Sequence, residues 1–211
     1  MPLMLHRRTL LRISTAGVVA PLLPMRRARA AADAAAPVAA LNRALTEIMK
    51  SGKTAPFPVR YQTLAPAVEE SFDLPAILRM TIGARWEDMP RAMQTALSAE
   101  FLRFTVASYV ANFDDAAGQR LEIMPDRRQV GGDVVVATRI LFPKDPPVRI
   151  DYVMRENEGQ WRVVDVLLDG SISRVAVQRS DFRHILEHGG PSALIASLHK
   201  KVEALSGGTL T

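Results

Sequence analysis

The sequence of 211 residues predicts an α+β fold. Apolar residues recur at helical spacing through the first half of the chain. After residue 120 the pattern changes to short segments rich in β-branched residues, divided by Gly, Pro, Asn and Asp. Helical spacing returns from about residue 175. Helices, then strands, then helices is an order typical of α+β domains.

The helical half contains four expected helices. The first starts at Val38 and ends at Gly52, and shorter helices are expected in YQTLAPAVEESF and LPAILRMTIGARW. The longest runs from about Pro90 to Phe113 and carries an unusually wide apolar stripe. A helix with so wide a stripe needs a large apolar partner surface.

Four strands are expected in RLEIMP, DVVVATRILFP, VRIDYVMRE and QWRVVDVLLDG. Turn residues between them favour an antiparallel sheet. In the last strand Val164, Val166 and Leu168 would share one face and Trp161, Val163 and Leu167 the other, which predicts a place near the sheet centre. Two helices, at about 175–188 and 191–205, close the chain. The expected whole is a curved four-stranded sheet with a helix across its concave face, a cone like those of NTF2-like and cystatin-like proteins.

Residues 1–30 read as a cleavable export leader. A basic start precedes an apolar stretch too short to span a bilayer, and Ala28-Arg29-Ala30 is a small-x-small cleavage site. Arg7 and Arg8 resemble a twin-arginine signal, and an ordinary secretory leader is the alternative. We expect residues 31–36 to be a flexible lead-in, 37–206 a single domain and 207–211 a tail.

Charge and cysteine content exclude several classes of protein. The six arginines of the leader account for the whole formal charge of +5, so the remaining chain offers no basic surface for nucleic acid. Cysteine is absent, which removes disulfides, thiol nucleophiles and Cys-ligated zinc. An exported domain of this size must then be stabilised by its apolar core.

Two features could carry chemistry. HILEH places His184 and His188 one helical turn apart with Glu187 between them, the H-x-x-E-H pattern of a class of zinc peptidases. No third ligand is evident, and a helix ending at Gly189 accounts for a histidine in its last turn, so we interpret HILEH as an accidental pattern. Asp165 is a lone acid in an apolar strand; it could act as a general base, but an ion pair with Arg174 or Arg179 is the simpler interpretation.

Two segments resemble the MlaC, or toluene-tolerance, family of periplasmic lipid-binding proteins. The first is WRVVDVLLDGSISRVAVQRSDFRHILEHGGPSALIASLHKK, with Trp161, Asp165-Val166 and Gly170-Ser171-Ile172-Ser173 at the matching positions. The second is FDLPAILRMTIGARW, and together they extend the resemblance over about residues 38–205. Gln178 departs from the family, which usually has Tyr there. VQRSDF and YVANFD look closest to the branch associated with hopanoid biosynthesis.

The resemblance implies a soluble, non-enzymatic carrier that uses no cofactor. It would hold the acyl chains of a phospholipid or hopanoid in an apolar cavity with the headgroup near the mouth. Its partners would be an inner-membrane ABC transporter complex and an outer-membrane lipoprotein complex, and its location the periplasm. At the HILEH positions the family needs no metal ligand.

The wide helical stripe and the apolar strand faces predict where this cavity lies, between the long helix and the concave side of the sheet. Their combined surface exceeds what one tight helix–sheet contact needs. We expect the lining to consist of Phe72, Ile77, Trp86, Phe101, Phe104, Tyr109, Phe113, Ile150, Tyr152, Met154, Val164 and Val166.

Overall fold

The computed structural model describes residues 23–114 and 118–210, with side chains from residue 34 onward. Helix α1 (Leu23–Ser51) is followed by the 3₁₀ turn η1 (Gly52–Thr54), α2 (Phe57–Ser71), α3 (Leu74–Ile82), the 3₁₀ turn η2 (Gly83–Trp86) and the long α4 (Arg91–Asn112). Most of the expected leader lies outside the described residues. The expected flexible lead-in, 31–36, is instead helical because α1 runs through it, and Ala34 is already buried in the core.

The second half consists of strands β1 (Arg120–Val130), β2 (Asp133–Leu141), β3 (Val148–Asn157), β4 (Gln160–Leu168) and β5 (Ile172–Ser173), followed by α5 (Arg174–Ser206). The strands form one antiparallel sheet in the order β1-β2-β3-β4-β5. The α+β prediction is confirmed, with a two-residue strand in addition to the four expected. Helix α5 breaks at Gly190, whose φ of 67° and ψ of −170° separate the two helices expected there.

The predicted central position of β4 is wrong, since only the short edge strand β5 lies beyond it. A β-bulge explains why its sequence is misleading. Val153 pairs with Asp165 but Met154 pairs with Val163, so Val164 is left over. Val163 and Val166 therefore face the same side of the sheet, and the apparent two-sided apolar pattern comes from the bulge.

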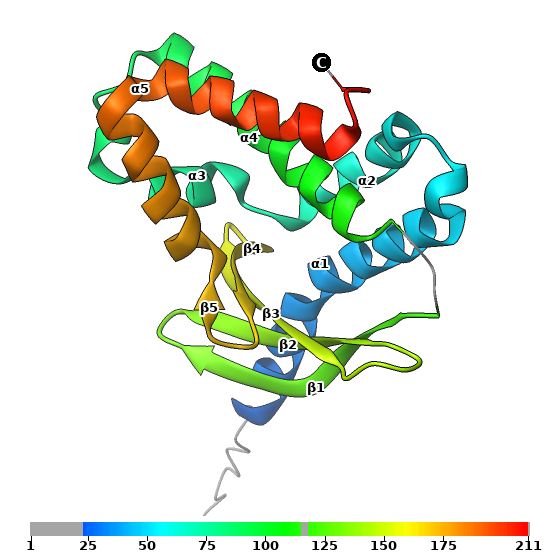
Figure 1. Cartoon of the computed structure of the whole chain (residues 1–211). Coiled ribbons are helices and arrows are strands. Elements are labelled where there is room, and N and C mark those ends of the chain that lie inside the picture. Colours follow the sequence, from blue (N-terminus) through cyan, green and yellow to red (C-terminus); the bar gives the residue numbers. More distant parts are fainter. Residues whose placement is uncertain (1–22, 115–117, 211) are drawn as a thin grey trace, which may run out of the picture.

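We call the side of the sheet that carries Tyr152 and Met154 its inner face. Helix α1 crosses this face and contacts β1, β2, β3 and β4, while α4 lies further from the sheet and α5 contacts β4 and β5 near its start (Figure 1). Val134, Val136, Met154 and Val163 are buried there in one cluster with apolar residues of α1. The core thus begins between α1 and one end of the inner face and continues among apolar residues of α2, α3, α4 and α5.

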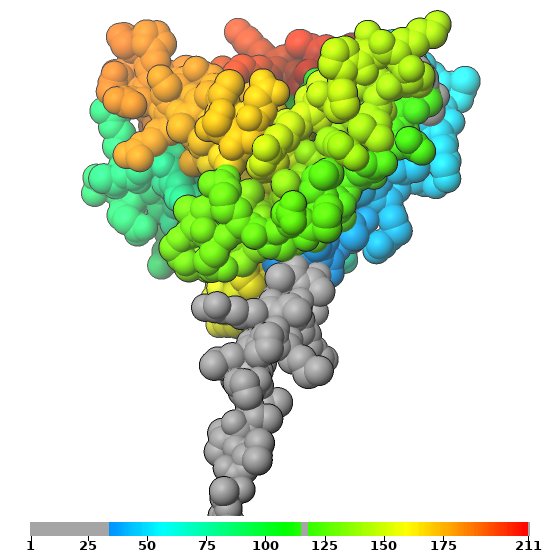
Figure 2. Space-filling model, turned by 90° about the horizontal axis from the view of Figure 1, so that it is seen from below, coloured from blue at the N-terminus to red at the C-terminus, as the bar shows by residue number. Residues whose placement is uncertain are grey.

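The opposite side of the sheet is formed by the strands themselves and has no helix over its middle (Figure 2). Its polar side chains pair across and along the strands. The Arg149 guanidinium binds the buried Asp151 carboxylate at 2.9 and 2.8 Å, and Arg155 binds Asp133 at 2.8 and 2.7 Å. Within the described part of the chain, no helix has the length and apolar character needed to cross a membrane.

Candidate functional site: a pocket between α4, α5 and the sheet

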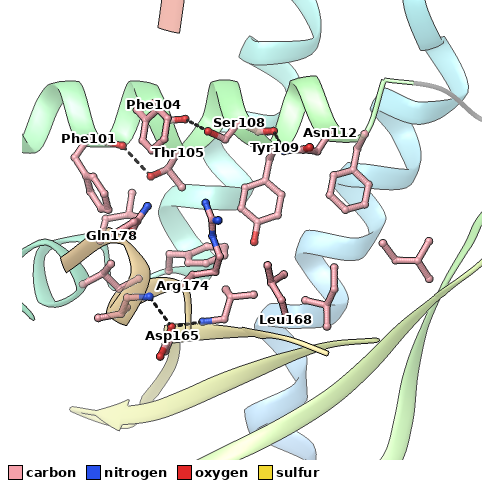
Figure 3. Close-up of a pocket in the computed structure, with 18 residues that line it drawn as sticks. Phe101, Phe104, Thr105, Ser108, Tyr109, Asn112, Asp165, Leu168, Arg174 and Gln178 are labelled. Carbon is pink, nitrogen blue, oxygen red and sulfur yellow. Dashed lines mark hydrogen bonds between the residues drawn. The ribbon is translucent and has the colours of Figure 1, made fainter. Parts of the chain in front are cut away.

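A pocket of about 410 Å³ lies between α4, the first turns of α5 and the end of the inner face that α1 leaves free (Figure 3). Its lining is mostly apolar and comes from α3, α4, α5 and three strands. The lining residues are Phe72, Leu74, Ile77, Phe101, Phe104, Thr105, Ser108, Tyr109, Asn112, Phe113, Ile140, Ile150, Asp165, Val166, Leu168, Arg174, Val175 and Gln178.

Helix α4 forms one wall because its lining residues recur at helical spacing on one side. The polar members of this wall donate their hydrogens to the helix itself. Thr105 Oγ1 donates to the Phe101 carbonyl at 2.8 Å, Ser108 Oγ to that of Phe104 at 2.7 Å, and the Asn112 amide to that of Ser108 at 2.7 Å. The wall can therefore accept hydrogen bonds from a ligand but has few hydrogens left to donate.

The sheet forms the facing wall. Ile150 pairs with Leu168, and Val166 pairs with Tyr152, so these side chains share the inner face. Ile140, near the end of β2, extends the same surface. Apolar contact with a ligand would be continuous from β2 to β4.

An aromatic group closes the inner end of the pocket. The Phe72 ring lies edge-on to the rings of Tyr109 and Tyr152, with centroid distances of 5.7 and 6.5 Å. The phenol groups of Tyr109 and Tyr152 lie next to each other. Burial raises the pKa of Tyr152 to about 12 and raises the pKa of Tyr109 well above its ordinary value. Both phenols are therefore uncharged at neutral pH.

Asp165 fixes the first turn of α5 against the pocket. Its carboxylate accepts hydrogen bonds from the Ser173 hydroxyl and from the N–H groups of Val166 and Val175, at 2.7 and 3.1 Å for the two N–H groups. Ser173 in turn caps α5 by accepting from the Ala176 N–H. The expected ion pair with Arg174 or Arg179 is wrong, because among the described residues the partners of this carboxylate are these three hydroxyl and N–H donors.

Eight of the predicted lining residues do line the pocket: Phe72, Ile77, Phe101, Phe104, Tyr109, Phe113, Ile150 and Val166. Four do not: Trp86, Tyr152, Met154 and Val164. Tyr152 and Met154 are on the expected face but belong to the closed core, and Trp86 is buried in η2. Val164 is displaced from the face of Val166 by the bulge, and Val163 takes its place there.

Two polar residues of α5, Arg174 and Gln178, line the pocket but are not among the lining residues that the sequence predicts. A signal for Arg174 exists in the sequence. A cation at the first position of a helix faces the positive end of the helix dipole, which is unfavourable unless something else requires it.

HILEH lies on the first half of α5 and away from the pocket. His184 and His188 are exposed, with ring centroids 4.6 Å apart, and Glu187 pairs with Arg85 at 3.7 Å. His188 Nδ1 lies 2.7 Å from the His184 carbonyl, as expected for a histidine in a last helical turn. Across the described ranges, 23–114 and 118–210, no group of three or more potential metal-binding side chains is present.

Comparison with known proteins decides the family. Residues 39–200 match the model of the MlaC protein family, which is most of the chain. The chain belongs to the MlaC family. It is also similar in structure to a phospholipid-binding protein from Ralstonia solanacearum, solved in complex with a phospholipid. That match has a TM-score of 0.71 and 20% sequence identity, and it covers 82% of this chain and 99% of the other. No curated protein matches the sequence.

At 20% identity the Ralstonia structure is evidence for the fold of this MlaC-family chain. Helices over one face of an open antiparallel sheet are thus established independently of the sequence pattern. The pocket between α4, α5 and the sheet is formed by this chain's own side chains.

Proposed function

We propose that this protein is a lipid carrier that shelters the acyl portion of a phospholipid in the pocket between α4, α5 and the sheet. The observation that carries the proposal is an apolar space that the helices leave unfilled on an otherwise well-packed sheet. Family membership and the phospholipid bound to the structurally similar Ralstonia protein support it. No part of the proposal requires a chemical step.

The energetics of lipid transfer explain why such a space is useful. Each buried methylene is worth about 0.8 kcal/mol, so a free acyl chain leaves a membrane for water very unfavourably. A pocket of about 410 Å³ is in the lower part of the usual range for ligand sites, about 300–1,000 Å³. It suits partial shelter of the acyl region, which would allow release as well as capture.

The enzyme alternative receives no support from Asp165. A general base is directed at its substrate, whereas the Asp165 carboxylate is directed at donors of the protein itself, the Ser173 hydroxyl and the N–H groups of Val166 and Val175. The zinc alternative needs a third ligand in addition to His184 and His188. Glu187, the remaining acidic residue of the motif, forms an ion pair with Arg85 instead.

The wider role is also part of the proposal. The predicted export leader favours action in the periplasm, and family membership favours exchange with an inner-membrane ABC transporter complex and an outer-membrane lipoprotein complex. The motifs VQRSDF and YVANFD favour the branch associated with hopanoid biosynthesis, so a hopanoid is the second candidate cargo.

Native mass spectrometry of the protein purified without added lipid tests the carrier function. We expect a bound species whose extracted mass identifies it as a phospholipid or a hopanoid. Protein that is free of lipid and takes up none from phospholipid vesicles would contradict the proposal. Fractionation of the expressing cells, with N-terminal sequencing of the product, tests export and cleavage after Ala30.

A further inference from the structure

His199 lies between two carboxylates, on the part of α5 that follows the break at Gly190. Its Nδ1 is 3.4 Å from Oε1 of Glu100 on α4, and its Nε2 is 3.7 Å from Oε1 of Glu203, one helical turn further along α5. The His199 side chain is 39% exposed, whereas that of Glu100 is only 10% exposed. Each ring nitrogen thus faces its own carboxylate, and one of these carboxylates is buried.

Glu100 is a buried acid whose two oxygens have different surroundings. Oε2 accepts a hydrogen bond from the Arg103 guanidinium at 3.1 Å. Oε1 is buried and has no hydrogen-bond partner among the described residues, and it is the oxygen that faces His199. A buried acceptor without a hydrogen bond lowers stability, because it has lost its water and gained nothing in exchange. A donor on His199 Nδ1 removes that cost.

The protonation state of the imidazole decides whether both of its contacts are favourable. A neutral imidazole carries one N–H, so its other nitrogen presents a lone pair. In either neutral tautomer of His199, that lone pair faces a carboxylate oxygen. The imidazolium has an N–H on both nitrogens. The positions of Glu100 and Glu203 therefore match the donors of the imidazolium and not those of a neutral ring.

Other titratable groups near Glu100 come from α4 and α2. Arg103 holds the oxygen of Glu100 that is turned away from His199. Tyr61, on α2, is close enough to feel both charges: burial raises its pKa, Arg103 opposes the rise, and Glu69 and Glu100 add to it. The contact of Glu100 with His199 thus belongs to a cluster that joins three helices.

The same turn of α5 also lies behind the wall of the pocket. Lys201 Nζ is 5.6 Å from the centroid of the Phe104 ring, and Phe104 lines the pocket. Phe104 follows Glu100 by one turn of α4, so both residues meet the same stretch of α5. Lys200, the other cation of this stretch, is exposed. Attachment of this stretch to Glu100 therefore also supports the helix that carries Phe104.

We infer that His199 is a pH-sensitive link between α5 and α4. Its imidazolium bridges Glu100 and Glu203 and fixes the second half of α5 on the outer side of the pocket wall. Histidine side chains change charge between about pH 5 and 8. Because the folded protein offers the proton-bearing ring two acceptors, the link stabilises the fold at the acidic end of this range and is lost as the pH rises. The inference does not depend on the proposed carrier function.

A double-mutant cycle in the full chain tests the link at two pH values. The free energy of unfolding in denaturant is measured for the wild-type protein, His199→Gln, Glu100→Gln and the double variant, at about pH 5.5 and about pH 8. At the lower pH the pair should contribute a factor of about three to ten to the folding equilibrium constant, as expected for an ion pair with one buried partner. At the higher pH this factor should fall to about one.

Two further variants complete the test. His184→Gln is the matched control, because it removes an exposed histidine from the same helix, and with Glu100→Gln it should show no coupling at either pH. Glu203→Gln changes a more exposed acid, and its coupling to His199 should have the same pH dependence. This second cycle gives an answer even if Glu100→Gln does not fold.

Two outcomes would overturn the inference. A coupling between His199 and the two acids that is equal at both pH values would show a contact that does not depend on the charge of the ring. Absence of coupling at both pH values would show that no link forms. Either result leaves the carrier function untouched, since no lipid enters the measurement.

Discussion

The two ends of the inner sheet face carry similar side chains but meet different neighbours. At one end, Met154 and Val163 are fully buried beneath α1. At the other end, Ile150 and Val166 are partly buried and line a pocket beneath α4 and α5. We refer to these as the closed end and the open end of the inner face.

The difference follows from the helices and not from the strands. Helix α1 packs directly on the closed end, where its apolar residues fill the space above the strands. Above the open end, α4 presents Thr105, Ser108 and Asn112 along with its aromatic residues, and these short polar side chains turn back onto their own helix. A pocket therefore arises where the covering helix carries small side chains that do not reach the sheet.

The largest expected difference between the two ends is in the cost of removing a side chain. Met154→Ala should lower the free energy of unfolding by about 2–5 kcal/mol, because the closed end cannot collapse around the lost atoms. Ile150→Ala, on the same strand and face, should cost less than half as much, since that side chain already borders open space. Denaturant unfolding of both variants measures this, and equal losses would mean that the two ends are packed alike.

The Tyr109–Tyr152 pair lies where the two ends meet, and it predicts a dependence of stability on high pH. The pKa of Tyr152 is raised to about 12, so its phenol stays neutral in the folded protein while the unfolded chain ionises near pH 10. The stability that this neutral phenol contributes is complete below pH 10. As the pH rises from 10 toward 12, the free energy of unfolding falls by about 1.4 kcal/mol per pH unit.

Phenolate absorbance measures this directly. At about pH 11 the folded protein should show clearly less phenolate than the chain in denaturant. The Tyr61→Phe variant, which changes the remaining tyrosine, should keep that deficit. Equal phenolate in the folded and denatured protein would mean that water reaches the pair, so that the closed end is not closed.

Asp165 supports only the open end, by fixing the turn of α5 that carries Arg174 and Val175. Asp165→Ala should cost about 1–3 kcal/mol, since the Ser173 hydroxyl and Val175 N–H lose their acceptor. It should also weaken lipid retention. Thermal unfolding and native mass spectrometry test both effects. Asp181→Ala, which removes an exposed acid from α5, is the control. Unchanged stability would show that these hydrogen bonds do not hold α5.

HILEH lies outside both ends, so its removal should have the smallest effect. The double variant His184→Ala, His188→Ala should change stability by less than about 0.5 kcal/mol, because both imidazoles are exposed. Lipid content should not change. Elemental analysis would contradict this prediction if it found stoichiometric zinc in the wild-type protein and none in the double variant.

Much of this architecture could be predicted from residue spacing. Helix α4 and strands β1–β4 follow clear periods, and six of the eight predicted residues that line the pocket follow from the faces those periods define. The division into a closed and an open end could not be predicted, because it depends on how far α1 reaches over the sheet. The bulge at Val164 has no Gly or Pro to announce it, and it exchanges Val164 for Val163 on the inner face.

The central claim is that the open end is a ligand space and the closed end a packed core, and a matched pair of substitutions tests it most directly. Val163 and Val166 are on the same strand and the same face, one at each end. Val163→Trp should overpack the core and lower the free energy of unfolding by about 1–3 kcal/mol or more.

Val166→Trp should instead fill the pocket, so that the protein unfolds at nearly the wild-type denaturant concentration but retains no lipid. Measuring the unfolding midpoint and the bound lipid of the two variants side by side gives the answer. A Val166→Trp protein that is destabilised as strongly as Val163→Trp and still carries its lipid would contradict the account.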